Sequence, residues 1–180
     1  MDKCNFWWKV DRLFIVNFMT EILIRTIEGS TLNSWILTTT WLWPFLEIIH
    51  FIGLSLLLGS MLVIDIRLAG YIRNMSIMRT HDLLPMAAIG FFINMVTGLL
   101  FLMGDPARYL INIGFQIKMA LILMAGLNAL LFALRIKPIM TQWDPCGDTN
   151  TEAKLIAYIS LILWFSVLLL GRLIPYVGTG

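Results

Sequence analysis

Long apolar stretches alternate with short polar segments along this chain, and the lengths of the apolar stretches indicate its architecture. An α-helix needs about 20 consecutive apolar residues to cross the roughly 30 Å hydrocarbon core of a bilayer. Apolar stretches that approach or exceed this length cover residues 41–64, 83–103, 110–134 and 155–176. We therefore expect an all-α integral membrane protein in which residues 31–180 form a bundle of four membrane-spanning helices.

Residues 1–30 have a different pattern, because charged side chains recur there at helical spacing. Glu21, Arg25 and Glu28 fall on one side of a helix, opposite apolar residues such as Phe18. An amphipathic helix of this kind lies in the membrane interface instead of spanning the bilayer. We predict that this leader is an interfacial helix, separate from the bundle.

The composition agrees with a membrane protein and argues against a soluble domain or a nucleic-acid-binding protein. Hydrophobic residues make up 59% of the chain and charged residues only 13%, which is far from the balance of a soluble domain. The formal net charge is +2, and no basic stripe with interleaved aromatic residues occurs. We therefore expect the lipid bilayer as the surroundings and no nucleic-acid partner.

The basic residues of the short loops predict the orientation of the bundle. The second loop carries only Arg108. The first and third loops carry or adjoin the other basic residues, which are Arg67, Arg73, Arg79, Arg135, Lys137 and Lys154. Because short loops rich in lysine and arginine stay in the cytoplasm, we expect both termini to lie outside, which in a bacterium is the periplasm.

Four ionisable side chains fall inside the predicted spans at similar depth. From the helical rise, Glu47 and His50 lie about 9 and 13 Å below the start of the first span. Lys118 lies about 9 Å below the start of the third span, and Arg172 lies about 6 Å inside the end of the fourth. Such groups cost roughly 2.5 to 3.5 kcal/mol each in hydrocarbon, so they usually face a protein interior or a binding site. We predict one polar layer in the outer half of the bundle.

The polar layer has two interpretations. Arg172 leans inward from its helix and Glu47 is the carboxylate at matching depth, so a bidentate ion pair between them would fix the order of the helices. Lys118 leans outward, toward water, and reaches the interface by snorkelling. Alternatively, the same groups form a site for a small ligand, because paired intramembrane charges serve both purposes.

Small and amide residues predict where the second span packs. One stripe of this helix holds Ala87, Gly90, Asn94, Thr97 and Gly98. Small residues let helices approach closely and amides bridge them, so we interpret the stripe as a helix–helix interface.

Haem b is the first cofactor that His50 suggests. A haem held by two histidines needs both imidazoles at similar depth. The chain has two histidines, and His81 precedes the second span at the opposite boundary, about 15 Å or more from His50 along the membrane normal. We therefore expect no bis-histidine haem within one chain. Haem with His50 alone, with a methionine, or shared between subunits stays open.

Copper and organic ligands are the other interpretations of the layer. Thioethers and an imidazole suit Cu(I), and the spans contain Met61, Met86, Met95, Met103, Met119 and Met124. Methionine also fills gaps in apolar cores, and none of these lies one turn from His50, so core packing is favoured. A single Glu-x-x-His step excludes a di-iron site, which needs two. The polar layer also suits proton handling, an anionic ligand or a quinone head group.

Several motifs resemble those of an uncharacterised family of small bacterial four-helix inner-membrane proteins. The longest run is Trp43-Pro-Phe-Leu-Glu47-Ile-Ile-His50-Phe-Ile-Gly53-Leu-Ser-Leu-Leu-Leu-Gly59, continuing to Asp65-Ile-Arg67-Leu-Ala-Gly70. Shorter ones are Thr97-Gly98-Leu-Leu-Phe, Asp105-Pro106, Phe115-Gln-Ile-Lys118 and Gly171-Arg172-Leu-Ile-Pro-Tyr176. That family is distantly similar to the copper-resistance D-type membrane proteins. The resemblance implies the bacterial inner membrane and a connection with copper or haem.

These observations give two functional hypotheses. In the first, the protein binds a cofactor or small ligand, such as haem, copper or a quinone, and uses it in electron transfer. His50 is then the axial or metal ligand, Glu47 orients or neutralises it, and Lys118 and Arg172 hold an anionic group. In the second, the protein is a non-catalytic accessory subunit of a larger membrane complex, and its leader docks on a partner subunit. We expect no enzymatic activity from either.

Overall fold

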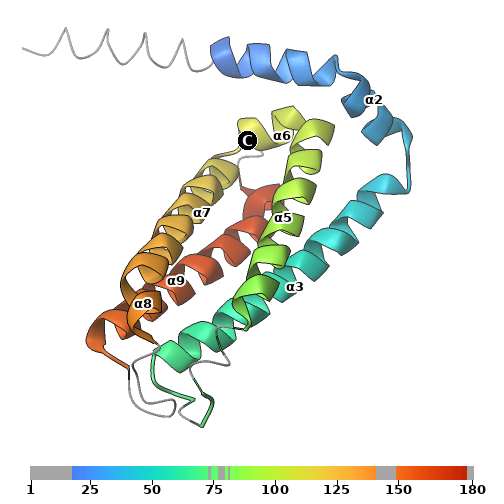
Figure 1. Ribbon diagram of the computed structural model, residues 1–180. Coiled ribbons are helices and arrows are strands. Elements are labelled where there is room, and N and C mark those ends of the chain that lie inside the picture. The colour runs from blue at the N-terminus through green and yellow to red at the C-terminus, as the bar shows by residue number, and fades with distance from the viewer. Residues whose placement is uncertain (1–17, 73, 77–79, 81, 141–148, 178–180) are drawn as a thin grey trace, which may run out of the picture.

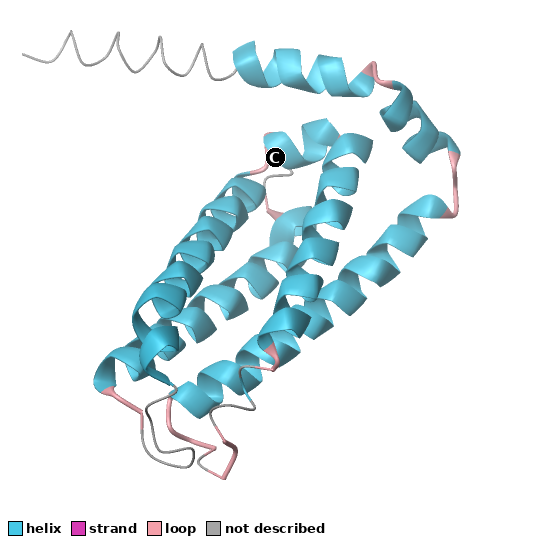
Figure 2. Cartoon of the chain, viewed as in Figure 1, coloured by secondary structure: helices cyan, strands magenta, loops and turns pink. Residues whose placement is uncertain are grey.

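The computed structural model describes residues 18–72, 74–76, 80, 82–140 and 149–177 (Figure 1). After a helical segment at 18–28, the elements are α2 (Thr31–Thr38), α3 (Leu42–Leu68), α5 (Leu84–Gly104), α6 (Pro106–Leu110), α7 (Ile113–Leu131), η1 (Phe132–Ile136), α8 (Lys137–Met140), α9 (Thr151–Leu173) and η2 (Ile174–Tyr176). Every regular element in these ranges is helical (Figure 2). The predictions for residues 1–17 and for His81 lie outside the described residues.

The four predicted spans are confirmed. In the described part of the chain, four helices are long and apolar enough to cross a membrane: Leu42–Leu68, Leu84–Gly104, Ile113–Ile139 and Thr151–Tyr176. Large apolar side chains cover their outer surfaces. Since a helix satisfies its own backbone hydrogen bonds, such surfaces suit a multi-pass protein surrounded by lipid.

The first span extends past its predicted end because the bundle buries the polar residues that follow Ile64. Asp65 and Arg67 are only 3% and 0% exposed, and α3 ends at Leu68. Gly70 has a φ of 93°, a left-handed conformation that glycine adopts without strain and that commonly terminates a helix. Polar residues near this end of α3 therefore belong to the bundle and not to a solvated loop.

The helices form two antiparallel pairs, α3 with α5 and α7 with α9, which are joined where α3 packs on α9 (Figure 1). Along the bundle the order is thus α5, α3, α9, α7. The helices at the two ends of this order, α5 and α7, are both fully described and touch each other only marginally. Ala87 of α5 and Ala125 of α7 nevertheless belong to one apolar core cluster, so the core continues between these two helices.

Helices α3 and α5 approach each other closely at two glycines. A Cβ atom built on Gly90 would lie 2.6 Å from the backbone N of Leu57 and 2.7 Å from the backbone O of Gly53. A Cβ on Gly53 would lie 2.7 Å from the side chain of Ile93. The two backbones touch here, which only glycine permits. This confirms the predicted interface at Gly90, whereas Gly98 faces open space.

The same two helices keep one register along much of their length. Facing positions recur seven residues apart on each helix, and three such pairs are Trp43 with Gly104, His50 with Thr97 and Leu57 with Gly90. A seven-residue repeat corresponds to two helical turns and is the spacing of antiparallel helices that coil around each other. A large side chain on α3 thus meets a small one on α5 at each step.

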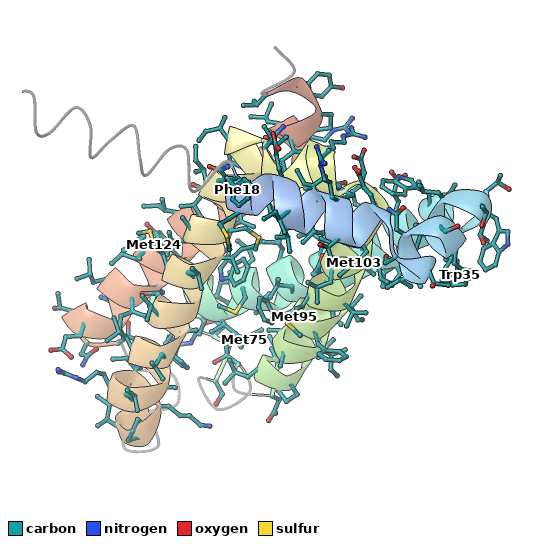
Figure 3. The ribbon with its side chains drawn as sticks, turned by 90° about the horizontal axis from the view of Figure 1, so that it is seen from above. Phe18, Trp35, Met75, Met95, Met103 and Met124 are labelled. Carbon is teal, nitrogen blue, oxygen red and sulfur yellow. The ribbon has the colours of Figure 1, made fainter. Side chains whose placement is uncertain are left out.

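One end of the bundle, called the α6 end below, is covered by the N-terminal part of the chain. The segment 18–28 crosses this end, and α2 follows it with Trp35 pointing outward (Figure 3). The Asn33 side-chain amide donates hydrogen bonds to the carbonyls of Met103 at 2.7 Å and Gly104 at 3.2 Å. These carbonyls end α5 and have no partner within the helix, so Asn33 fixes α2 to α5.

Asn112 performs a similar role between α7 and α9. Its side-chain oxygen accepts hydrogen bonds from the N–H groups of Gly114 and Phe115 at 2.8 and 3.3 Å, as an N-cap does. Its amide nitrogen donates to the carbonyl of Ile174 at 3.0 Å and also to that of Val177. One side chain therefore starts α7 and holds the end of α9 beside it.

The opposite end, called the α8 end, is held by buried polar residues. Arg67 Nε donates to the Met75 carbonyl at 2.6 Å. Thr149 Oγ1 donates to the Leu68 carbonyl at 2.6 Å. Arg67, counted above among the loop cations, is therefore a buried structural residue.

We predict that Gly90→Ala destabilises the bundle by about 1–3 kcal/mol, because its methyl group has to separate two touching backbones. Gly98→Ala, on the same helix, is the control and should leave stability within about 1 kcal/mol or raise it. Thermal unfolding in mild detergent, followed by circular dichroism, measures both. Equal stability of the two variants would contradict the crossing at Gly90.

Candidate functional site

The predicted polar layer lies toward the α6 end. By helical rise, His50 is about 12 Å from the start of α3, and Lys118 is about 8 Å from the start of α7. Thr97 is about 10 Å from the end of α5, so it reaches the same depth. Both His50 and Lys118 are half-buried, and Thr97 is buried. Three helices thus contribute polar side chains to one layer.

A hydrogen bond to Thr97 orients the His50 ring. The Nδ1 atom of His50 lies 2.7 Å from Thr97 Oγ1, and this hydroxyl also lies 2.7 Å from the Ile93 carbonyl, to which it donates. A hydroxyl has one hydrogen, so while it donates to Ile93 it accepts from Nδ1–H of His50. The neutral ring then carries its proton on Nδ1 and leaves Nε2 as an acceptor.

Aromatic rings extend this arrangement toward Glu47. The His50 ring meets Phe101 edge-on with 5.5 Å between ring centroids, and Phe101 lies 5.2 Å from Trp43. Trp43 Nε1 donates to Glu47 Oε1 at 3.2 Å. The Trp43 ring is accommodated by Gly104, where a Cβ would come within 2.7 Å of it. Glu47 is thus connected to His50 through two aromatic side chains and not directly.

Lys118 approaches the layer from the other helix pair. A Cβ on Gly171 would lie 3.4 Å from Lys118 Nζ, so the ammonium group rests against α9 where that helix has no side chain. The structure therefore places Lys118 against α9, at about the depth of His50.

The expected ion pair between Glu47 and Arg172 is not formed. Both side chains are exposed, and no ion pair joins these two described residues. Glu47 is held by Trp43, and it lies close enough to Tyr109 of α6 to influence it: burial raises the pKa of the Tyr109 hydroxyl, and the Glu47 charge contributes to this increase. Arg172 and Glu47 were predicted to share a layer because they lie at equal depth. Each side chain, however, lies on an exposed face of its helix.

The methionine side chains do not fit a copper site at His50. Met86, Met95, Met119 and Met124 are exposed on the outer surface of the bundle. Met61 packs against the apolar core, and Met103 packs against a separate apolar cluster near the α6 end. These positions agree with core and surface packing, and they do not give the imidazole a set of thioether ligands.

The surroundings of His50 hold no group of protein metal ligands among the described residues. Among the described residues, no three His, Cys, Asp or Glu side chains gather as a metal site. His50 is the one histidine of the described spans, and its ring faces a hydroxyl and a phenyl group. The Nε2 atom of this oriented imidazole can accept a hydrogen bond or serve as a single axial ligand.

Sequence reasoning missed the residues that position His50. Thr97 stood in the predicted packing stripe, and Trp43 and Phe101 were not singled out. The sequence feature that could have identified these residues is the seven-residue spacing. It places Thr97 opposite His50, and Gly104 opposite Trp43. This spacing becomes informative only once the register of α3 and α5 is known.

We predict that Thr97→Val shifts the tautomer of neutral His50 away from Nδ1–H, because valine has the same shape but accepts no hydrogen bond. The substitution should also cost about 1 kcal/mol of stability. The ¹⁵N chemical shifts of the imidazole, assigned with the His50→Ala variant, report the tautomer. Thr97→Ser keeps the hydroxyl and should keep the wild-type spectrum. An unchanged spectrum in Thr97→Val would contradict the assigned hydrogen bond.

Comparison of the chain with known proteins does not assign it to a family. No family model matches the chain, and no curated protein or solved structure matches it either.

Proposed function

We propose that this protein is a multi-pass protein of the bacterial inner membrane that binds a small, lipid-soluble ligand of the quinone or quinol type at His50 and Lys118. The observation that carries the proposal is the His50 ring held by Thr97 at 2.7 Å, in the same polar layer as the half-buried Lys118. The short loops favour periplasmic termini and hence a site in the outer half of the membrane.

The two polar groups have complementary hydrogen-bonding capacities. Neutral His50 with Nδ1–H bonded to Thr97 presents Nε2 as an acceptor, which suits the O–H of a quinol. Lys118 presents N–H donors, which suit the second oxygen of the ring, and most of all a phenolate or carbonyl oxygen. A ligand with two oxygens on opposite sides of a flat ring engages both groups.

The surroundings of His50 also suit a flat apolar ring. Phe101 packs edge-on against the imidazole at 5.5 Å, and aromatic side chains favour stacked or edge-on contacts with a further ring. A site of this kind binds ligand without a covalent step, so binding and not catalysis is proposed.

We predict that His50→Ala and Lys118→Met each weaken the binding of decylubiquinol at least about tenfold, since each removes one hydrogen-bond partner in a low-dielectric site. Isothermal titration of the protein in mild detergent measures the affinity. Lys137→Met, which removes an exposed cation of α8, is the control and should bind as the wild type does. Wild-type affinity in both site variants would refute the proposal.

An oxidised and reduced absorption spectrum with metal analysis, on protein purified from its native membrane, tests the competing cofactors. A Soret band or stoichiometric copper that disappears in His50→Ala would replace the quinol proposal by haem or copper binding. A stoichiometric partner that co-purifies, with no ligand bound at His50, would instead favour the accessory-subunit hypothesis.

A further inference from the structure

A second polar position lies about 22 Å from His50 along α3, by helical rise. A cavity of about 230 Å³ is found there between α3 and α9, and Asp65 lines it together with apolar residues, among them Gly59 and Trp164. Leu62 and Phe165 also line the cavity and are exposed on the outer surface of the bundle. The cavity therefore reaches the lipid-facing side.

Asp65 is buried without full hydrogen bonding. Its side chain is 3% exposed, and its Oδ2 atom has no hydrogen-bond partner among the described residues. Ser160 of α9 is buried as well, and no described cation forms an ion pair with Asp65. A buried carboxylate with an unsatisfied oxygen is costly unless a positive charge or a donor compensates it.

We propose that this cavity binds an organic cation, namely an ammonium group carried on an apolar body. Asp65 supplies the counter-charge, and the faces of Trp164 and Phe165 attract a cation while they contact the apolar part. Gly59 provides space for the ligand, because a Cβ at this position meets no atom within 4 Å. The site is separate from the one proposed at His50, and neither depends on the other.

Two sources supply this chemistry. Asp65 lies about 4.5 Å from the end of α3 by helical rise, near the depth at which the head group of an aminophospholipid such as phosphatidylethanolamine lies. A free amine dissolved in the bilayer presents the same ammonium group. Both enter from the lipid side, where the cavity opens between Leu62 and Phe165.

The charge is tested with 4-phenylbutylammonium and its neutral isostere 4-phenylbutanol, titrated calorimetrically into the full-length protein in mild detergent. The wild type should bind the ammonium at least about tenfold more tightly than the alcohol, and Asp65→Asn should lose this difference. Equal affinity for the two compounds, or an unchanged preference in Asp65→Asn, would overturn the proposal.

The location is tested by filling the cavity. Gly59→Leu places a side chain in the open space beside Asp65 and should abolish binding of the ammonium probe. Gly126→Leu is the matched control, because a Cβ at Gly126 on α7 also meets nothing within 4 Å and Gly126 does not line the cavity. Wild-type affinity in Gly59→Leu would overturn the location, and this variant decides the matter alone if Asp65→Asn does not fold.

The two sources are separated in lipid nanodiscs. If the head group of phosphatidylethanolamine occupies the cavity, the probe should bind more weakly in nanodiscs that contain this lipid than in nanodiscs of phosphatidylglycerol alone. Equal affinity in the two preparations assigns the site to a free amine.

Discussion

The backbone contact between α3 and α5 at Gly53 and Gly90 is the constraint on which the rest of the layer depends. It fixes how far one helix is shifted along the other. Because both helices rise by the same amount per residue, this shift persists along their length and brings Thr97 opposite His50, two turns away. A slip of one residue would rotate each facing position by about 100° and remove the hydrogen bond. Packing therefore determines the chemistry of the site.

Neutral amides and hydroxyls, more than charges, connect the helices. Asn33, Asn112, Asn128 and Thr149 each donate to a backbone carbonyl of another element. Three of these bonds go to carbonyls at helix ends, where the helix itself offers no partner. They satisfy polar groups that lipid would leave unpaired, and they do so without the desolvation cost of an ion pair. This leaves charged residues such as Glu47 free to lie exposed at the α6 end.

The spans and the depth of the polar layer could be predicted because both depend on one coordinate, the distance along each helix. The rotation of each helix about its own axis could not be predicted in this way. This rotation decides which side chains of neighbouring helices contact each other. Arg172 has the depth of Glu47 but lies on an exposed face of α9, so the predicted pair was wrong. Thr97 was assigned to packing for the same reason. Asp65, next to the predicted end of the first span, became a buried group only when α9 packed against it.

His50 and Asp65 show two ways in which a membrane bundle keeps a polar side chain. His50 has a partner within the protein, and the Thr97 bond leaves one ring nitrogen available in a fixed direction. Asp65 keeps a carboxyl oxygen without a partner beside a cavity, an arrangement whose cost falls when a cation or a hydrogen-bond donor binds there. The first arrangement is oriented before a ligand arrives, whereas the second is completed by one. The cavity beside Asp65 is lined by residues exposed on the lipid-facing surface, so the bilayer, and not the aqueous phase, is the reservoir from which the proposed cation would enter it.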